Sequence, residues 1–443
     1  MTKDQEDRFV AIAGKASDIG LLVLDEGSFN DITILAHISA RMSDLRGCSR
    51  PFGGVPVLLL LDFHQKQGVA GTQMHKALII ADLSNDLLEA LKVNSKGRDK
   101  VTLTHFGADR IGVNLFRRFR RFNLVRQMRA SDDPTHSEHL NQIRDIASEQ
   151  PISEEILNSL QPLTAAALEK DPNLKFAKIV AMSWREIFPL TVMQITRWAK
   201  VHSLPVIQWP KELIGTAAGY LDQDETVLLY KNEACGLHER FVVGMPGTFT
   251  QNIDTQNGIV NGGNCTYVSL TMGDNQPSVE ELVAAASLND TNWIDGVLFV
   301  TLRTRPLSIN VKMMVPKEQA ERMKLKHYLL PDPPDYDPSG PSGLREVHLA
   351  VTLLPDGRMS EEYTPTSSFA AFDMPTKFKV RTFPLVPNFV VTDFKVQGTT
   401  EPCLISCLRQ RRHLPPFTVT SFNVQFSRVR SAKKFYTLGL DKK

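Results

Sequence analysis

The chain has 443 residues, of which 42% are hydrophobic and 23% charged, so it can form two or three compact domains and global disorder is excluded. Its net charge of +2 excludes nucleic-acid binding driven by the charge of the whole chain. The charged N-terminus does not fit a secretory signal, and the longest apolar run, Val55–Leu61, is too short to cross a bilayer. We therefore expect a soluble intracellular protein whose binding sites are local.

The first 130 residues alternate apolar runs with helical periodicity, which is typical of parallel α/β units. Leu21–Leu24 is predicted to be a buried strand that ends at Asp25-Glu26. A helix is expected over Ile32–Met42, and a second strand over Val57–Leu61 ends at Asp62. Both strands therefore place acids at their carboxyl ends, where open α/β sheets bind ligands.

A dense basic cluster precedes residue 130 and surrounds Phe119; it consists of Arg117, Arg118, Arg120 and Arg121. The periodicity favours the solvated side of a helix whose core face is formed by Leu115, Phe116 and Phe119. Local nucleic-acid binding is the alternative.

Residues from about 138 to 220 have a helical pattern, interrupted by a strand near Ala177–Met182 and followed by a helix over Trp184–Trp198. From about 225 to 385, short β-rich runs alternate with glycine and proline clusters, which predicts a small inserted β-domain. Ser278 and Glu281 form a capping box for one short helix. The α/β pattern then returns over Phe389–Thr392, Leu404–Leu408 and Val419–Phe426.

The acidic pair Asp25-Glu26 suits nucleotide hydrolysis, because one carboxylate can hold Mg²⁺ through its water shell while the next activates water. A second pair, Asp224-Glu225, precedes its apolar run instead of following it, so its position does not fit this chemistry. Gln65 follows the neighbouring strand and could contact a γ-phosphate, or belong to an ordinary polar loop. The cysteines contain no CxxC pair, so a structural metal site is not expected.

Five segments in this order resemble motifs II to VI of Pif-one-like superfamily 1 DNA helicases, most closely the group that includes Helitron transposon helicases. They are Leu-Asp-Glu-Gly-Ser around Asp25, Pro51–Gly54 with Asp62–Gln65, Leu124–Arg129, Thr392–Gly398 and Phe426–Ser431. The resemblance spans about residues 20 to 437. It implies an α/β fold with two RecA-like domains, of which the first is truncated, and an inserted SH3-like β-domain.

The implied boundaries are 1–127 for the first RecA-like domain, 128–242 and 385–443 for the second, and 243–384 for the SH3-like insertion. By resemblance, Asp25 would coordinate Mg²⁺, Glu26 would activate water and Gln65 would sense the γ-phosphate of ATP. Arg129 and Arg428 would act as arginine fingers, each worth about 10³- to 10⁵-fold in rate. Single-stranded DNA would lie along Thr392, Lys395, Gln397 and Gly398.

The family's activity is ATP-dependent DNA unwinding in the 5′ to 3′ sense, with roles in DNA repair, recombination and telomere maintenance and residence in the nucleus. Cations for a single-strand grip in the inserted β-domain would come from Arg303, Arg305, Lys312, Lys317 and Lys324, although stackable aromatic residues are sparse there. A solvated surface is the alternative.

The sequence also departs from the family. It contains no GxxxxGK[ST] phosphate loop, and Gly14-Lys15 lies too close to Asp25 to be one. The prolines of motif III are missing after Gln65, and Gly27 replaces an apolar residue. A fragment of a longer gene and a decayed transposon copy both fit, and both predict that this polypeptide alone does not hydrolyse ATP.

Three hypotheses follow: a piece of an active helicase, a single-stranded-DNA-binding remnant without turnover, or an inert product that folds poorly.

Overall fold

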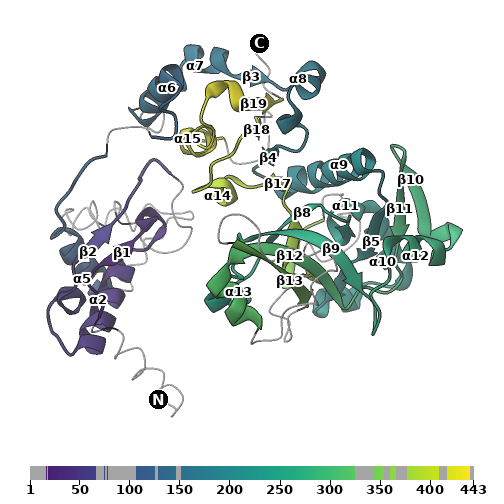
Figure 1. The fold of residues 1–443 in the computed structure, drawn as a ribbon, viewed down its shortest axis with the longest axis horizontal. Helices are drawn as coiled ribbons and strands as arrows, with labels where there is room; N and C mark the ends of the chain where they lie inside the picture. Colours follow the sequence, from purple (N-terminus) through teal and green to yellow (C-terminus); the bar gives the residue numbers. More distant parts are fainter. Residues whose placement is uncertain are drawn as a thin grey trace. The chain divides into compact units, whose positions relative to one another are not determined.

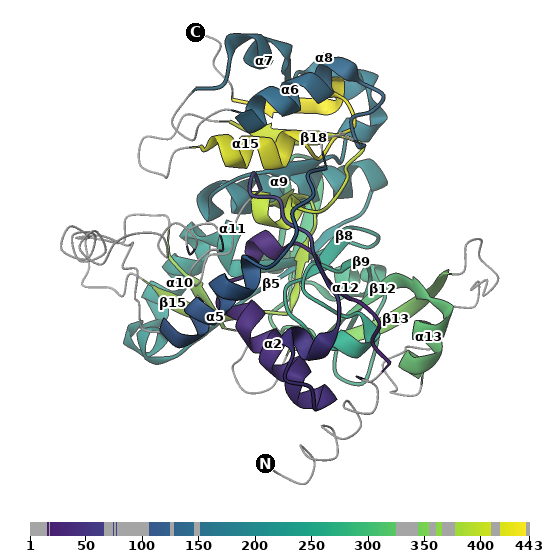
Figure 2. The ribbon, with the colours of Figure 1, turned by 90° about the vertical axis from the view of Figure 1, so that its left-hand side faces the viewer.

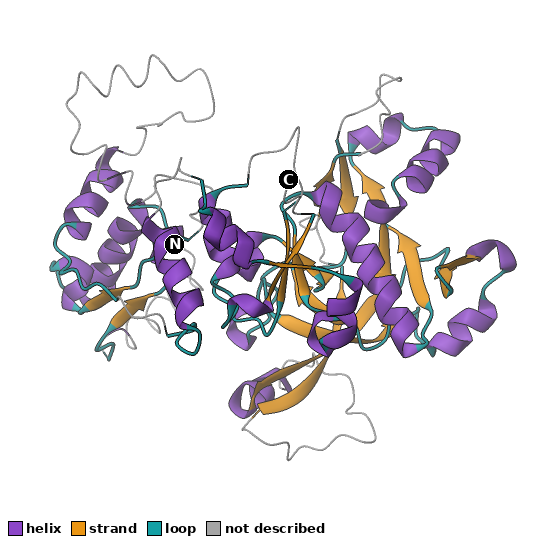
Figure 3. Ribbon diagram, turned by 90° about the horizontal axis from the view of Figure 1, so that it is seen from above, coloured by secondary structure: helices purple, strands orange, loops and turns teal. Residues whose placement is uncertain are grey.

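The structure is a computed structural model that describes residues 16, 18–65, 74, 77, 106–124, 128–145, 151–324, 344–353, 360–365, 377–408 and 417–439. The chain divides into two compact units. Unit 1 comprises residues 1–159, 397–400 and 416–432, and unit 2 comprises residues 160–396, 401–415 and 433–443. Figure 3 shows that both helices and strands build the molecule.

Unit 1 contains the two strands predicted near the N-terminus, β1 (Leu22–Leu24) and β2 (Val57–Leu59), which pair in parallel with Leu22 opposite Val57. β2 ends two residues earlier than predicted, and the first strand is not buried as predicted, since Leu21 and Val23 are 54% and 49% exposed. A hydrophobic core lies on one side of this sheet, between the sheet and the helices α2 (Thr33–Arg46) and α5 (Phe106–Phe116) (Figure 1). The parallel pair confirms that Asp25 and Asp62 follow neighbouring strands at the same edge.

Helix α2 buries Leu35, Ala36, Ser39 and Met42, which recur at helical spacing. It ends at Gly47, whose φ of 58° is the left-handed conformation that glycine adopts without a Cβ penalty. The prediction of a helix over residues 32–42 is confirmed, with an additional turn at its C-terminal end.

Further α-helices within the described part of unit 1 are α6 (Pro134–Asp145), α7 (Glu154–Ser159) and α15 (Val419–Phe426). Helices α6 and α15 pack together, as Figures 1 and 2 show, although hundreds of residues separate them in the sequence. The ring of His136 meets Phe426 edge-on at 4.5 Å, and its Nε2 lies 3.2 Å from the carbonyl oxygen of Val429. This contact fixes the segment that carries Arg428 within unit 1.

Unit 2 contains an all-parallel sheet with strand order β17-β4-β18-β19-β3. Its strands are β17 (Val390–Val391), β4 (Lys178–Val180), β18 (Leu404–Cys407), β19 (Phe435–Leu438) and β3 (Gln161–Pro162). The predicted strands near residues 177, 389 and 404 are its members. This sheet confirms the α/β class.

An antiparallel sheet with order β13-β12-β9-β8-β16 occupies the segment where an inserted β-domain was expected. Its strands are β13 (Leu344–Thr352), β12 (Ser308–Pro316), β9 (Asn264–Thr271), β8 (Pro246–Phe249) and β16 (Leu385–Pro387). That it is SH3-like stays a prediction, as do the three boundaries between the predicted domain segments.

Two smaller sheets complete the described strands of unit 2, in the orders β10-β11-β5-β7 and β14-β15-β6. They comprise β10 (Thr291–Ile294), β11 (Val297–Thr301), β5 (Val206–Pro210), β7 (His238–Phe241), β14 (Ser360–Tyr363), β15 (Phe378–Arg381) and β6 (Glu212–Ile214).

The helices of unit 2 are α8 (Ala165–Lys170), α9 (Trp184–His202), α10 (Gln223–Asn232), α11 (Ala234–Leu237), α12 (Val279–Ala285), α13 (Lys317–Lys324) and α14 (Asp393–Val396). The predicted capping box is confirmed at α12, where Ser278 and Glu281 cap each other's backbone amides. Among the described helices, none combines the length and the apolar content that crossing a bilayer requires.

Gly112 sets the spacing between α2 and α5. A Cβ added at Gly112 would lie 2.2 Å from the carbonyl oxygen of Ile32, so the two helices would have to separate. We expect Gly112→Ala to lower the free energy of unfolding by about 1–3 kcal/mol, although alanine favours helix more than glycine does. Urea unfolding measures this, with Asn114→Ala at an exposed position of the same helix as control. Equal stability of the two variants would contradict the close approach.

His238 makes unit 2 sensitive to acid. Burial, with the charges of Arg240 and Lys211 nearby, lowers the pKa of His238 to about 4, below its unfolded value near 6.5. The unfolded chain therefore binds the proton first, so the stability due to neutral His238 is complete above pH 6.5 and is lost as pH falls towards 4. We expect a loss of up to about 1.4 kcal/mol per pH unit between pH 6 and 5.

Denaturant midpoints measured across this pH range test that expectation. His238→Gln should flatten the dependence, whereas a control substitution at exposed His202 should leave it unchanged. If His238→Gln has the same pH dependence as the unmodified chain, the assigned role of this histidine is wrong.

Candidate functional site

The acidic pair Asp25-Glu26 follows β1 in a constrained backbone. Glu26 has a φ of 51°, a left-handed conformation that is uncommon outside glycine and concentrates at functional sites. The next amide, of Gly27, donates to the carbonyl oxygen of Leu60 at 2.9 Å. A Cβ on Gly27 would lie 2.6 Å from Leu59 Cδ1 and 2.7 Å from Leu61 Cδ2, so a larger residue here would require these leucine side chains to move. The pair is thereby held against the strand that leads to Asp62.

The loop after β2 is tied to α6 and α15. Gln65 Nε2 donates to Asp62 Oδ2 at 3.0 Å, and Arg144 of α6 forms an ion pair with the same oxygen at 3.1 Å. Asn423 of α15 donates to the carbonyl oxygen of His64 at 2.9 Å. Gln65 therefore lies beside the acidic loop, and its side-chain carbonyl has no hydrogen-bond donor among the described residues.

Arg428 lies just beyond the C-terminal end of α15, and only 3% of its surface is exposed. Its Nε donates to the carbonyl oxygen of Val424 at 2.8 Å, and its Nη2 donates to Ser427 Oγ at 2.7 Å. Burial, together with the nearby charge of Arg129, lowers the pKa of Arg428 to about 10, so the guanidinium stays charged at neutral pH. The nearby negative charges of Glu26 and Asp62 act in the opposite sense and raise the pKa of Arg428.

Arg129 is held beside Arg428 by the same turn. Its Nη1 donates to the carbonyl oxygen of Ser427 and its Nε to Thr400 Oγ1, both at 2.9 Å. Burial lowers the pKa of Arg129 as well. Within the described residues, neither Arg129 nor Arg428 forms an ion pair with a carboxylate, and neutral oxygens accept all their hydrogen bonds.

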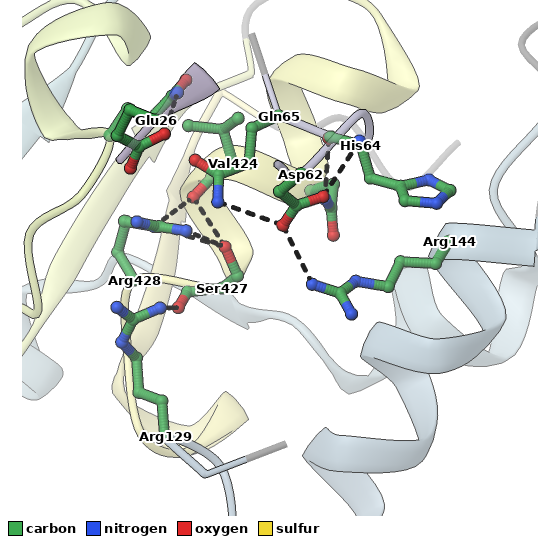
Figure 4. A network of polar contacts seen from close by, with 11 residues as sticks. Glu26, Asp62, His64, Gln65, Arg129, Arg144, Val424, Ser427 and Arg428 are labelled. Carbon is green, nitrogen blue, oxygen red and sulfur yellow. Dashed lines mark hydrogen bonds and ion pairs between the residues drawn. The ribbon is translucent and has the colours of Figure 1, made fainter. Parts of the chain in front are cut away.

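Two adjacent guanidinium groups repel each other, and among the described residues neither forms a direct ion pair, so Glu26 and Asp62 offset this repulsion only from a distance. An anion with several oxygens would satisfy both arginines at once. Figure 4 shows these arginines with Glu26 and Asp62 around the end of α15.

Gln397 and Gly398 of the fourth motif segment also lie at Glu26. Gln397 Nε2 is 3.4 Å from Glu26 Oε2, which is a long hydrogen bond. Gly398 has a φ of 79°, and a Cβ there would lie 3.7 Å from Glu26 Oε1. A residue that the resemblance assigns to DNA therefore contacts the residue assigned to water activation.

Thr392 and Lys395 belong to unit 2, where Thr392 directly precedes α14 and Lys395 lies within it. The amide of Lys395 donates to the carbonyl oxygen of Thr392 at 3.0 Å, and its Nζ donates to Asn261. Burial lowers the pKa of the Lys395 amine.

The structure thus brings together within unit 1 most of the residues singled out from sequence, namely Asp25, Glu26, Gln65, Arg129, Gln397, Gly398 and Arg428. Sequence reasoning missed Arg144, Thr400 and Ser427, which hold Asp62 and the two arginines. Ser427 lies within the Phe426–Ser431 segment and Thr400 lies two residues after Gly398, but nothing in the pattern of α6 distinguishes Arg144. Val125, Arg126 and Gln127 of the motif IV segment lie outside the described residues.

The cations noted in the β-domain are largely paired. Arg303 pairs with Asp290 at 3.0 Å, Lys312 pairs with Glu346 at 3.2 Å, and Arg305 pairs with Glu212. These ion pairs favour the solvated surface over a single-strand grip at these three positions.

Comparison with known proteins gives structural matches only, since neither a protein-family model nor a curated protein matches the chain. The crystal structure of the Pif1 helicase from Candida albicans matches with a TM-score of 0.50 and 16% identity, over 98% of this chain and 75% of that one. The chain has the fold of a Pif1 helicase.

Two Pif1 structures from Bacteroides also match. One, in complex with ADP-AlF3 and single-stranded DNA, has 15% identity and a TM-score of 0.49 over 97% of this chain and 73% of that one. The other, bound to single-stranded DNA, has 16% identity and a TM-score of 0.48 with the same coverage. At 16% identity, the likeness to the Candida albicans structure establishes the fold alone.

Proposed function

We propose that this chain belongs to an ATP-dependent DNA helicase of the Pif1 type. To the nucleotide site of that helicase it contributes the carboxylate that activates water and the two arginines that bind the phosphoryl group. The observation that carries the proposal is the pair Arg129 and Arg428, which lie close together without a carboxylate partner among the described residues and beside Glu26. A phosphoryl group in transfer carries the dispersed negative charge that two guanidinium groups can bind.

These residues fit a nucleotide in other respects. Asp25 is exposed at the end of β1, where it can hold Mg²⁺ through water. A magnesium ion held this way would take most of its ligands from phosphate oxygens and water. ATP, when bound, supplies the phosphoryl group that water attacks.

Each side chain would then have a defined task. Glu26 accepts the proton of the attacking water, while Arg129 and Arg428 donate hydrogen bonds to phosphoryl oxygens. Gln397 orients Glu26 through the contact between their side chains. Because Gln397 directly follows α14 with Thr392 and Lys395, a change in DNA contact can reach the water-activating carboxylate along the chain.

The test is DNA-stimulated ATP hydrolysis by this chain extended with the coding sequence upstream of Met1 in the same reading frame, here called the extended protein. We expect hydrolysis and 5′ to 3′ unwinding when the extension supplies a phosphate loop. An extended protein that has the loop but shows no DNA-stimulated hydrolysis would overturn the proposal.

The second candidate is a single-stranded-DNA-binding remnant without turnover, of the Helitron type. It is favoured by the sequence itself, which contains no GxxxxGK[ST] segment while retaining the DNA-side residues Thr392 and Gln397. This candidate predicts salt-dependent binding of single-stranded DNA by the chain as it stands, weakened by Thr392→Ala. It is rejected if no binding is seen at low salt.

A further inference from the structure

The segment Arg117–Leu124, which follows α5, does not have the structure expected from its periodicity. Helix α5 ends at Phe116, residues 117–119 form a turn, and residues 120–124 are neither helix nor strand. Phe119 does face the core as predicted, with its ring 6.2 Å from Phe52 and 6.3 Å from Phe116. The arginines are therefore presented by a non-helical segment anchored at Phe119, and the helix predicted through them is wrong.

The cations of this segment contrast with those of the β-domain. Arg118, Arg120 and Arg121 are exposed, and none of them forms an ion pair within the described part of the chain. Where the structure describes both partners, Arg121 Nε donates to Asn123 Oδ1 at 2.9 Å. Their charge is thus available to an external anion.

An aromatic ring lies directly among these cations. Phe122 is 81% exposed and follows Arg120 and Arg121, and Leu124, two residues further along, is 88% exposed. Exposing two large apolar side chains in one short segment is unfavourable in water, which points to a ligand with a flat apolar surface as well as negative charge.

We propose that Arg118–Leu124 binds single-stranded nucleic acid, with Arg118, Arg120 and Arg121 on phosphates and a base stacked on Phe122. Unpaired bases offer the faces that an aromatic side chain can stack on, and the backbone offers one charge per nucleotide. An acidic membrane is less suitable, because surface-bound segments of this composition act as amphipathic helices and residues 120–124 are not helical. The inference does not depend on the nucleotide site.

The experiment is fluorescence anisotropy of a labelled oligothymidylate titrated with the full chain and its variants. Phe122→Ala should weaken binding by about 5- to 100-fold, and Phe122→Tyr should retain it because stacking is preserved. The double variant Arg120→Ala/Arg121→Ala should weaken binding and reduce the slope of log affinity against log salt by about 1.4. Lys200→Ala removes an exposed cation of unit 2 and serves as the matched control.

These substitutions affect exposed side chains, and an unchanged thermal unfolding midpoint will show that each variant is folded. Wild-type affinity in both Phe122→Ala and the double arginine variant would overturn the proposal. The proposal would also fail if the variants lose binding to phosphatidylserine vesicles but keep binding to oligothymidylate. It would fail as well if duplex DNA binds as tightly as the single strand and Phe122→Ala changes neither affinity.

Discussion

Replacing Arg428 with alanine is expected to lower kcat for DNA-stimulated ATP hydrolysis by about 10³- to 10⁵-fold in the extended protein. The guanidinium is 3% exposed and is held by Val424 and Ser427, so its position is fixed before a ligand binds. Fixed donors aimed at developing charge stabilise a transition state without a reorganisation cost. Steady-state phosphate release measures the effect.

Arg430 provides the matched control, because it lies two residues further along the chain and is exposed. Arg430→Ala should retain hydrolysis within about threefold of the unmodified protein, as expected for a solvated surface charge. If Arg428→Ala and Arg430→Ala had the same kcat, Arg428 would not contact the phosphoryl group.

We expect substitution of Arg428 to affect stability and activity in opposite directions. Its buried charge lies beside Arg129 without a carboxylate partner among the described residues, so Arg428→Met should raise the free energy of unfolding by about 1 kcal/mol. A purely structural arginine would instead lose stability on this substitution. Denaturant unfolding of the chain distinguishes the two results.

The second large effect concerns Glu26. Glu26→Gln removes the base that accepts a proton from water but keeps the shape of the side chain, so kcat in the extended protein should fall about 10²- to 10⁴-fold. Affinity for Mg²⁺-ATP should change little, because Glu26 is assigned no contact with the nucleotide. Single-turnover hydrolysis together with nucleotide titration separates the two quantities.

The second acid pair of the chain supplies the control for this substitution. Asp224 is exposed near the start of α10, where the adjacent Glu225 completes a capping box. Asp224→Asn should leave hydrolysis unchanged. If Glu26→Gln lowered the affinity for Mg²⁺-ATP as much as it lowered kcat, Glu26 would bind the nucleotide and would not activate water.

Local patterns in the sequence predicted the elements that depend on local interactions. The parallel strands that end before Asp25 and Asp62, the helix over residues 33–46 and the capping box at Ser278 follow from periodicity and side-chain hydrogen bonding between near neighbours. The motif residues were found because their order resembles a known family.

Features set by long-range packing could not be predicted. The left-handed backbone of Glu26 precedes a hydrogen bond from the Gly27 amide to Leu60 on the neighbouring strand, and the ion pair between Arg144 and Asp62 joins segments 82 residues apart. The burial of Arg428 requires α15 to pack on α6. Periodicity also missed the end of α5 at Phe116, because Phe119 continues the apolar spacing from within a turn.

The central claim is that Arg129 and Arg428 bind a phosphoryl anion next to Glu26. The most direct test is isothermal titration of the chain as it stands with Mg²⁺-ATP, compared with Arg129→Ala/Arg428→Ala. The account predicts saturable binding that the double variant weakens by about 10-fold or more, since each charge-assisted hydrogen bond contributes about 1.5–3 kcal/mol. Indistinguishable titrations of the two proteins would contradict it.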